Sequence, residues 1–162
     1  MDFGVIVVSD RVYRGLARDT SGVKAKNIIE SKGYRVSYYT IVPNDIGKIR
    51  SALNNAINRG CRVVVLIGGS GIGPRDVTVE AVKPLFEKEI PGFGELFRLI
   101  SYNRIGCRAW LSRAVAGVYN NTLVTVIPGS TSAVELALNE ILLPEVDHAI
   151  DMIKGVSHWN RE

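Results

Sequence analysis

The stretch Val63–Asp76, VVVLIGGSGIGPRD, decides the fold of this chain. Its five leading apolar residues run directly into a segment with four glycines. A continuous apolar run that ends at glycines is typical of a strand buried on both faces, as in a parallel sheet. Glycine lets the backbone turn sharply and approach a ligand, and ligands of open α/β sheets bind at the carboxyl ends of strands. The stretch therefore predicts a loop that binds an anion, with phosphate expected; a tight turn without a ligand is the alternative.

The rest of the chain alternates between apolar, β-branched runs and segments with apolar residues at helical spacing. The predicted strands, besides Val63–Ile67, are Phe3–Ser9, Arg35–Val42, Ala114–Tyr119 and Leu123–Ile127. The predicted helices cover about 22–33, 46–60, 78–86, 93–100, 132–142 and 145–154. Strands that alternate with helices predict an α/β fold with a mostly parallel sheet. One antiparallel hairpin is expected at Asn120-Asn121, because asparagine tolerates positive φ.

Polar residues ahead of these helices predict where the helices begin. Ser21 or Thr20 is expected to cap the first helix, and Thr78 is expected to cap the helix after the glycine loop. Ser132 opens an S-x-x-E sequence that matches a capping box. Pro144 is expected to end the helix that this box begins.

Length and composition are those of one globular domain, predicted over residues 1–162. The net charge of +4 suits an anionic ligand, but the basic residues are scattered and no nucleic-acid-binding motif appears, so no nucleic acid partner is expected. Cys61 and Cys107 lie in no metal-binding pattern; free thiols are expected, and a disulfide stays open. No signal peptide and no membrane-spanning run is found, so a cytoplasmic protein without membrane contact is expected.

If the strands are parallel, the loops at their carboxyl ends meet at one edge of the sheet. These loops are Ser9-Asp10-Arg11, Pro43-Asn44-Asp45, the glycine loop through Asp76, and Pro128-Gly129-Ser130. They combine hydroxyls, glycine amides and arginine charges, which bind phosphate. The carboxylates of Asp45 and Asp76 can hold Mg²⁺ together with the phosphates of a ligand. The loops therefore predict a site for a nucleotide or a phosphorylated substrate.

Each of these polar residues also has a purely structural interpretation. Asp45 and Ser130 could serve only as helix caps, and Asp76 could be a cap or the partner in a surface ion pair. Arg75 could simply pair with Asp76. The sequence leaves these alternatives open.

The glycine loop matches neither of the common nucleotide-binding fingerprints. A Walker A motif ends in Gly-Lys-Ser/Thr, whereas this loop continues as Gly73-Pro74-Arg75. A Rossmann G-x-G-x-x-G needs its third glycine at the position of Pro74. A standard P-loop NTPase and a dinucleotide-binding domain are therefore excluded as classes.

Several motifs together resemble one family. They are Ser9-Asp10-Arg11, GGSGIGPRDVTVEA from Gly68, PGFGELFR from Pro91, LSRAVAG from Leu111 and PGSTSAV from Pro128. In this order they resemble the molybdopterin adenylyltransferase family, the MoaB/MogA-type proteins of molybdenum cofactor biosynthesis. The resemblance covers nearly the whole chain, from Gly4 to about Lys154.

The resemblance implies a three-layer α/β/α sandwich that assembles as a homo-oligomer, a trimer or a hexamer. It also implies Mg²⁺-dependent transfer of AMP from ATP to the terminal phosphate of molybdopterin, with release of pyrophosphate. Asp76 matches the acidic catalytic position, and we expect it to act with Asp45 in catalysis and in holding Mg²⁺. The residues that match ligand-binding positions are Gly68, Gly69, Ser70, Gly71, Ser112, Gly129 and Ser130.

The chain departs from the family pattern in two places. The family loop usually reads Thr-Gly-Gly-Thr-Gly, whereas here it reads Ile67-Gly68-Gly69-Ser70-Gly71, which keeps one hydroxyl and loses the other. Active members commonly carry an acidic residue at the position of Asn44, so Asp45 is the only carboxylate in that loop. Asn44 favours the alternative function, a non-catalytic molybdopterin-binding oligomeric protein of the same fold. The glycine loop and Asp76 argue against a third possibility, a scaffold without a ligand.

Overall fold

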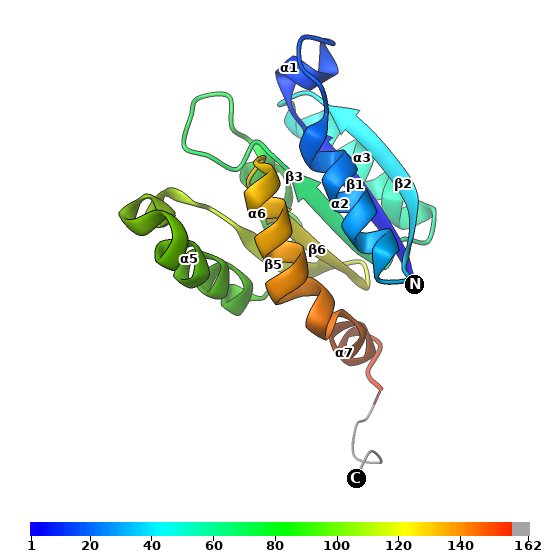
Figure 1. The fold of residues 1–162 in the computed structure, drawn as a ribbon. Coiled ribbons are helices and arrows are strands. Elements are labelled where there is room, and N and C mark those ends of the chain that lie inside the picture. Colours follow the sequence, from blue (N-terminus) through cyan, green and yellow to red (C-terminus); the bar gives the residue numbers. More distant parts are fainter. Residues whose placement is uncertain (157–162) are drawn as a thin grey trace.

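The computed structural model describes residues 1–156, and over that range the chain forms one six-stranded sheet (Figure 1). The strands are β1 (Asp2–Val8), β2 (Arg35–Val42), β3 (Val63–Ile67), β4 (Lys88–Glu89), β5 (Val115–Tyr119) and β6 (Thr122–Ile127), in the order β2-β1-β3-β6-β5-β4. β1 pairs in parallel with β2 and β3, and β3 pairs in parallel with β6. β4, β5 and β6 pair antiparallel. The predicted mostly parallel sheet with an antiparallel hairpin is confirmed.

Helices cover both faces of the sheet, which confirms the predicted three-layer α/β/α arrangement (Figure 1). One face packs against α2 (Thr20–Ser31), α5 (Pro91–Ile105), α6 (Thr131–Leu136) and α7 (Leu143–Ile153), and the other against α3 (Ile46–Asn58) and α4 (Thr78–Val82). Successive side chains of a strand point to opposite faces. In β3, Val63, Val65 and Ile67 therefore pack in the first core, and Val64 and Leu66 in the second. All five residues are buried, as the opening stretch predicted.

The first helix, α2, begins with a different cap from the predicted one. The carboxylate of Asp19 accepts the N–H of Gly22 at 2.9 Å and caps the helix. The predicted caps, Ser21 and Thr20, already lie inside it. The hydroxyl of Ser21 instead donates to the carbonyl oxygen of Gly129. The hydroxyl that was predicted to cap the helix therefore makes a tertiary contact.

The helices α4 and α6 also begin differently from their predictions. α4 starts after Val77 without a side-chain cap, because the hydroxyl of Thr78 donates to the carbonyl oxygen of Gly68 at 2.7 Å. α6 is capped by Ser130, two residues before the predicted Ser132. Both differences place a hydroxyl at the carboxyl edge of the sheet.

Short elements complete the chain up to residue 156. They are α1 (Asp10–Tyr13), the 3₁₀ helices η1 (Lys83–Leu85) and η2 (Gly106–Leu111), and the π-helical segment η3 (Ala137–Leu142). The prediction that Pro144 ends a helix is wrong, because η3 joins α6 to α7 and Pro144 sits in the first turn of α7, where a proline is tolerated. Asn120 and Asn121 have φ of 48° and 56°, which confirms the predicted hairpin turn. Both cysteines are free thiols.

Candidate functional site

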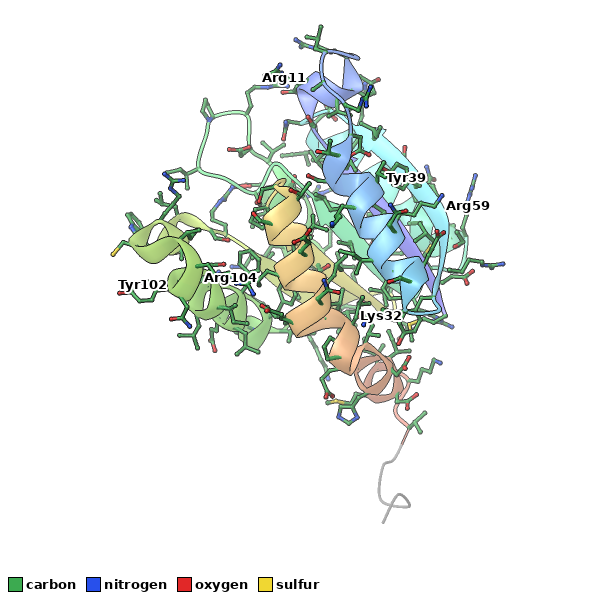
Figure 2. All side chains as sticks on the ribbon, viewed as in Figure 1. Arg11, Lys32, Tyr39, Arg59, Tyr102 and Arg104 are labelled. Atoms are coloured by element: carbon green, nitrogen blue, oxygen red, sulfur yellow. The ribbon has the colours of Figure 1, made fainter. Side chains whose placement is uncertain are left out.

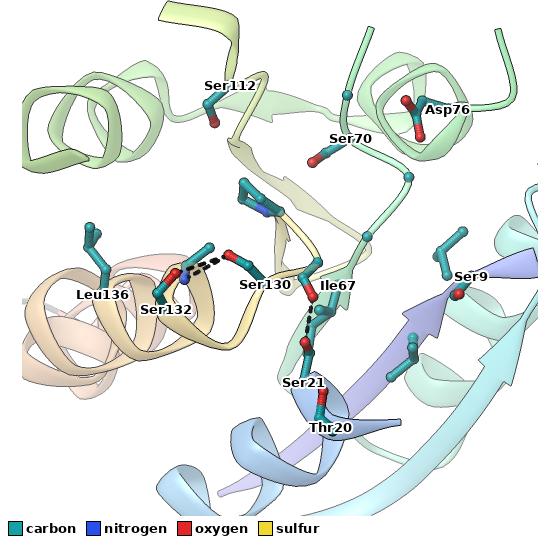
Figure 3. A pocket seen from close by; sticks show the side chains of 18 of the residues that line it. Ser9, Thr20, Ser21, Ile67, Ser70, Asp76, Ser112, Ser130, Ser132 and Leu136 are labelled. Carbon is teal, nitrogen blue, oxygen red and sulfur yellow. Dashed lines mark hydrogen bonds between the residues drawn. The ribbon is translucent and has the colours of Figure 1, made fainter. Parts of the chain in front are cut away.

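The four predicted loops come together at the carboxyl edge of the parallel strands and line a cavity of about 780 Å³ (Figure 3). Residues of α5, η2 and α6 line the cavity as well, among them Phe97, Ser101 and Leu136. The cavity is therefore bordered by the ends of the parallel strands and by residues of α5, η2 and α6. Its volume lies in the range of small-molecule and cofactor sites.

Most of the predicted site residues line this cavity. They are Gly68, Gly69, Ser70, Gly71, Asp76, Ser112, Gly129 and Ser130. Figure 3 shows Ser70 and Ser112 on the same side of the cavity and Ser130 across from them, just before α6. Asp45 is not among the lining residues in the described part of the chain.

The glycine loop leaves β3 through two residues with left-handed backbone. Gly68 has φ of +99°, and a Cβ there would lie 2.4 Å from the carbonyl oxygen of Val8. Gly69 has φ of +62°, and a Cβ there would lie 2.3 Å from Oγ1 of Thr78. Only glycine adopts such a conformation at so close an approach without strain. The first two glycines are therefore needed to pass the loop across the end of β1.

The second part of the loop winds around the carboxylate of Asp76. The N–H of Gly73 donates to Oδ2 of Asp76 at 2.9 Å. A Cβ on Gly71 would lie 2.7 Å from the same oxygen, and one on Gly73 2.9 Å from it. Asp76 therefore shapes the loop, and its carboxylate also faces the cavity that the loop lines.

Asp10 joins three of the four loops. Its carboxylate accepts the backbone N–H of Asn44 at 2.9 Å and pairs with the guanidinium of Arg75, with Nε–Oδ2 at 3.1 Å. Arg75 thus pairs with Asp10 instead of Asp76, which was the open alternative. The Arg75 guanidinium, followed by the Asn44 amide, lowers the pKa of Asp10 to about 2. This carboxylate, which lines the cavity, is therefore charged at neutral pH.

Asp45 has the structural role that the sequence left open. Its Oδ1 accepts the N–H of Lys48 at 2.8 Å and caps α3, and its side chain is exposed. A catalytic or metal-binding role for Asp45 stays a prediction, and the cap is what the geometry assigns to it.

The loop that ends β6 is held to α2. Ser130 caps α6 by accepting the N–H of Ala133 at 3.2 Å, and the hydroxyl of Ser21 holds the carbonyl of Gly129 (Figure 3). A Cβ on Gly129 would lie 3.4 Å from Cα of Gly68, so the backbones of the two loops are in close contact. Ser130 therefore has both the capping role and a place in the cavity wall.

Two arginines that the sequence did not single out hold the cavity wall from outside. Arg98 of α5 donates to the carbonyls of Ser112 and Ala114 at 3.3 and 3.1 Å. Arg113 donates to carbonyls of the glycine loop and pairs with Glu80, whose pKa the Arg113 guanidinium lowers below its ordinary value. Arg113 lies within the LSRAVAG motif, but the motif gives no sign of which backbone carbonyls it reaches.

The cavity also has a positive rim. Arg11 and Arg18 lie on its α1–α2 side, and Arg104 and Arg108 lie on its α5–η2 side. All four side chains are exposed, and Arg104 also pairs with Glu140. Positive charge around a cleft attracts anions and raises their rate of association.

The residues of the cavity fit a Mg²⁺ ion that shares its ligands with a substrate. Residues 1–156 contain no group of three His, Cys, Asp or Glu side chains that could hold a metal by themselves. Asp76 offers a carboxylate to the cavity, and Oδ1 of Asn44, another lining residue, is buried without a hydrogen-bond partner in the described chain. Mg²⁺ usually takes one or two carboxylates, several waters and the phosphates of the nucleotide. This donor set therefore suits a metal that arrives with a nucleotide.

Comparison with known proteins shows the family of this chain. The family described as "Probable molybdopterin binding domain" matches residues 4–148. Molybdenum cofactor biosynthesis protein B of Staphylococcus aureus is 46% identical over 149 residues, which are 90% of this chain and 88% of that protein. The tungsten cofactor synthesizing protein MoaB of Pyrococcus furiosus is 42% identical, with a TM-score of 0.89 over 94% of this chain and 96% of that structure. The molybdopterin biosynthesis enzyme MoaB of Thermus thermophilus is 35% identical, with a TM-score of 0.86 over 95% and 96%.

The fold, the cavity and the matched residues define a protein with a molybdopterin-binding domain. Within that class, the chain belongs to the MoaB/MogA family of molybdenum cofactor biosynthesis. The resemblance read from the motifs is therefore confirmed. Across residues 1–156, no helix has the length and apolar character that a bilayer crossing requires.

Proposed function

We propose that this protein transfers AMP from ATP to the terminal phosphate of molybdopterin and releases pyrophosphate. The observation that carries the proposal is the glycine loop, which wraps the carboxylate of Asp76 at the edge of a cavity with a positive rim. The loop suits phosphate groups, the carboxylate suits their metal ion, and the cavity leaves room for a second substrate.

The chemistry needs no covalent nucleophile from the protein. A phosphate oxygen of the pterin attacks the α-phosphorus of ATP, the bond to the β-phosphate oxygen breaks, and pyrophosphate leaves. The protein must hold the two substrates in line and supply donors where negative charge accumulates. The amides of Gly71 and Ile72, which find no acceptor within residues 1–156, and the hydroxyls of Ser70 and Ser130 offer such donors. The rim arginines favour entry of both anionic substrates.

Mg²⁺ would be held by the Asp76 carboxylate and by Oδ1 of Asn44, and it would neutralise charge on the leaving pyrophosphate. Asp76 already accepts one N–H from the loop, so its second oxygen is the one available to the metal. Asp45 faces solvent beside this site as the α3 cap, and its predicted contribution to catalysis would act from there.

The alternative function is a molybdopterin-binding protein without catalysis. Asn44 is the observation that favours it, because a neutral amide replaces the acidic side chain expected in active members. An amide oxygen binds Mg²⁺ more weakly than a carboxylate does, since it carries only a partial charge.

One assay distinguishes the transferase from the non-catalytic binding protein. The purified protein is incubated with molybdopterin, ATP and Mg²⁺, and adenylylated pterin and pyrophosphate are measured, with a reaction lacking Mg²⁺ as control. Formation of both products in equal amounts supports the transferase. Tight binding of molybdopterin without either product would overturn the transferase and support the alternative.

We also propose that the chain forms a homo-oligomer through α5 and η2. Leu96, Leu99 and Tyr102 are exposed at helical spacing on α5, and Trp110 of η2 is 76% exposed. Figure 2 shows Tyr102 pointing away from the sheet. Exposed apolar patches commonly mark interaction sites. Light scattering should give a mass that is a multiple of the 17.7 kDa chain, and this mass should be smaller for the variant Leu99→Lys. A monomeric native protein would contradict the proposal.

A further inference from the structure

The guanidinium of Arg113 lies behind the glycine loop, where it connects three segments of the chain. Its Nε donates to the carbonyl oxygens of Ser70 and Gly71 at 3.2 and 3.0 Å. Its Nη2 donates to the carbonyl oxygen of Gly71 at 2.5 Å and to Oε2 of Glu80 at 3.3 Å, and Nη1 donates to Oε1 of Glu80. Arg113 itself belongs to the segment between η2 and β5. The guanidinium therefore ties that segment to α4 and to the loop.

These hydrogen bonds fix the orientation of two peptide planes in the loop. In a planar trans peptide the C=O and the following N–H point in opposite directions. Because the carbonyls of Ser70 and Gly71 point to Arg113, the N–H groups of Gly71 and Ile72 point away from it. Ser70 and Gly71 line the cavity, whereas Arg113 does not. The N–H of Gly71 is therefore turned toward the cavity side of the loop. The N–H of Ile72, a residue just outside the lining, points in the same direction.

The same two N–H groups have no acceptor within the described chain. Successive backbone N–H groups that point the same way form a concave site for anions. Arg113 does not supply the charge of such a site, because Glu80 neutralises its guanidinium. Its contribution is to hold the donors in place.

We infer that Arg113, held by Glu80, is a positioning residue that aligns the amides of Gly71 and Ile72 for a phosphate group of the nucleotide. Lysine cannot replace it, because the planar guanidinium reaches two carbonyls and a carboxylate at once, whereas an ammonium is a compact point charge. This inference rests on the proposed function for the identity of the ligand. The orientation of the loop does not depend on it.

The test compares Arg113→Lys with a matched control, Arg35→Lys. Arg35 also makes a two-pronged ion pair, with Asp2, but at the opposite edge of the sheet and outside the cavity lining. Two quantities are measured: Kd for Mg-ATP by calorimetry, and hydrogen exchange of the Gly73 amide by NMR without ligand. The Gly73 amide reports the shape of the loop, because its acceptor is Asp76.

We expect Arg113→Lys to raise Kd for Mg-ATP about tenfold and to speed exchange at Gly73, while Arg35→Lys changes neither. Glu80→Gln keeps the arginine at the loop and should raise Kd less, which covers the case in which Arg113→Lys folds poorly. An unchanged Kd in Arg113→Lys, or a change equal to that of Arg35→Lys, would overturn the inference. Failure of the native protein to bind Mg-ATP would count against the proposed function, and exchange at Gly73 would still decide the role of Arg113 in the loop.

Discussion

The guanidinium of Arg75, at the end of the glycine loop, forms a two-pronged ion pair with the carboxylate of Asp10, at the end of β1. Nε lies 3.1 Å from Oδ2, and Nη2 lies 3.2 Å from Oδ1. The same carboxylate accepts the N–H of Asn44, from the loop after β2. One aspartate therefore links the loops of three adjacent parallel strands at the edge where the cavity lies.

The Arg75–Asp10 pair should make stability depend on pH in acid. Because the pKa of Asp10 is lowered to about 2, its contribution is fully present above the ordinary value of 3.8 and is lost as the pH falls through about 2. Arg75→Gln removes the largest cause of this shift. The side chain of Arg75 is 66% exposed and solvent screens the pair, so we expect only a small loss of stability at neutral pH.

Urea unfolding of the native protein and Arg75→Gln at several pH values measures this difference. The two unfolding free energies should converge as the pH falls from about 4 to about 2. A difference that persists unchanged at pH 2 would show that Arg75 stabilises the fold through packing.

Asp76→Asn should abolish AMP transfer while molybdopterin binding survives. An asparagine at this position can still accept the N–H of Gly73 through Oδ1, so the loop keeps its shape while the charge that holds Mg²⁺ is lost. Turnover and molybdopterin affinity are measured on the same preparation. Unchanged turnover would exclude Asp76 as a catalytic residue.

Asp45→Asn is the matched control, because it also removes one carboxylate charge from the same edge of the sheet. Asparagine caps helices about as well as aspartate does, so α3 should stay intact. We expect a smaller loss of turnover than in Asp76→Asn, since Asp45 lies outside the cavity lining. An equal loss would establish Asp45 as a metal ligand.

Asn44→Asp should raise the rate of AMP transfer and lower the Mg²⁺ concentration needed for half-maximal rate. Within residues 1–156 the Asn44 Oδ1 is buried without a partner, and a carboxylate there would give the metal a second charged ligand. Without Mg²⁺ the variant should be less stable, because the new carboxylate would lie beside that of Asp10. A rate that does not rise at any Mg²⁺ concentration would show that Asn44 does not limit catalysis.

Gly68→Ala should destabilise the protein and disturb the loop. The alanine would have to adopt φ of +99° with its Cβ against the carbonyl oxygen of Val8, a strain of roughly 1–3 kcal/mol. Gly92→Ala is the control: Gly92 lies in the first turn of α5 with open space around it, and alanine there should stabilise by about 0.4–1 kcal/mol. Thermal unfolding compares the two, and equal midpoints would contradict the geometry of Gly68.

The sequence predicted those parts of the fold that rest on local patterns. β3 was predicted because an apolar run that ends at glycines has few other uses, and the hairpin because Asn120-Asn121 tolerates positive φ. β4 has only two exposed residues and leaves no pattern. The predicted caps of α2 and α4 were wrong because the hydroxyls of Ser21 and Thr78 donate to carbonyls of other segments. Sequence spacing does not show such partners.

The candidate site was predictable to the same extent. Its loops could be predicted because parallel strands share one carboxyl edge, and the cavity contains residues of all four. The contacts of Arg113 and the Arg75–Asp10 pair could not be predicted, because each joins residues that are more than thirty positions apart in the sequence. Polar side chains that bind backbone carbonyls carry no periodicity, so only the folded chain reveals them.

The Asn120-Asn121 turn lies where β6 begins, at the edge of the sheet opposite to the cavity. Both asparagines adopt positive φ, the N–H of Asn120 donates to Glu87, and the turn contributes no residue to the cavity lining. A fluorophore or an affinity peptide joined there would leave the ligand-binding edge unobstructed. The hairpin is therefore a suitable attachment point for immobilising or labelling this protein during activity measurements.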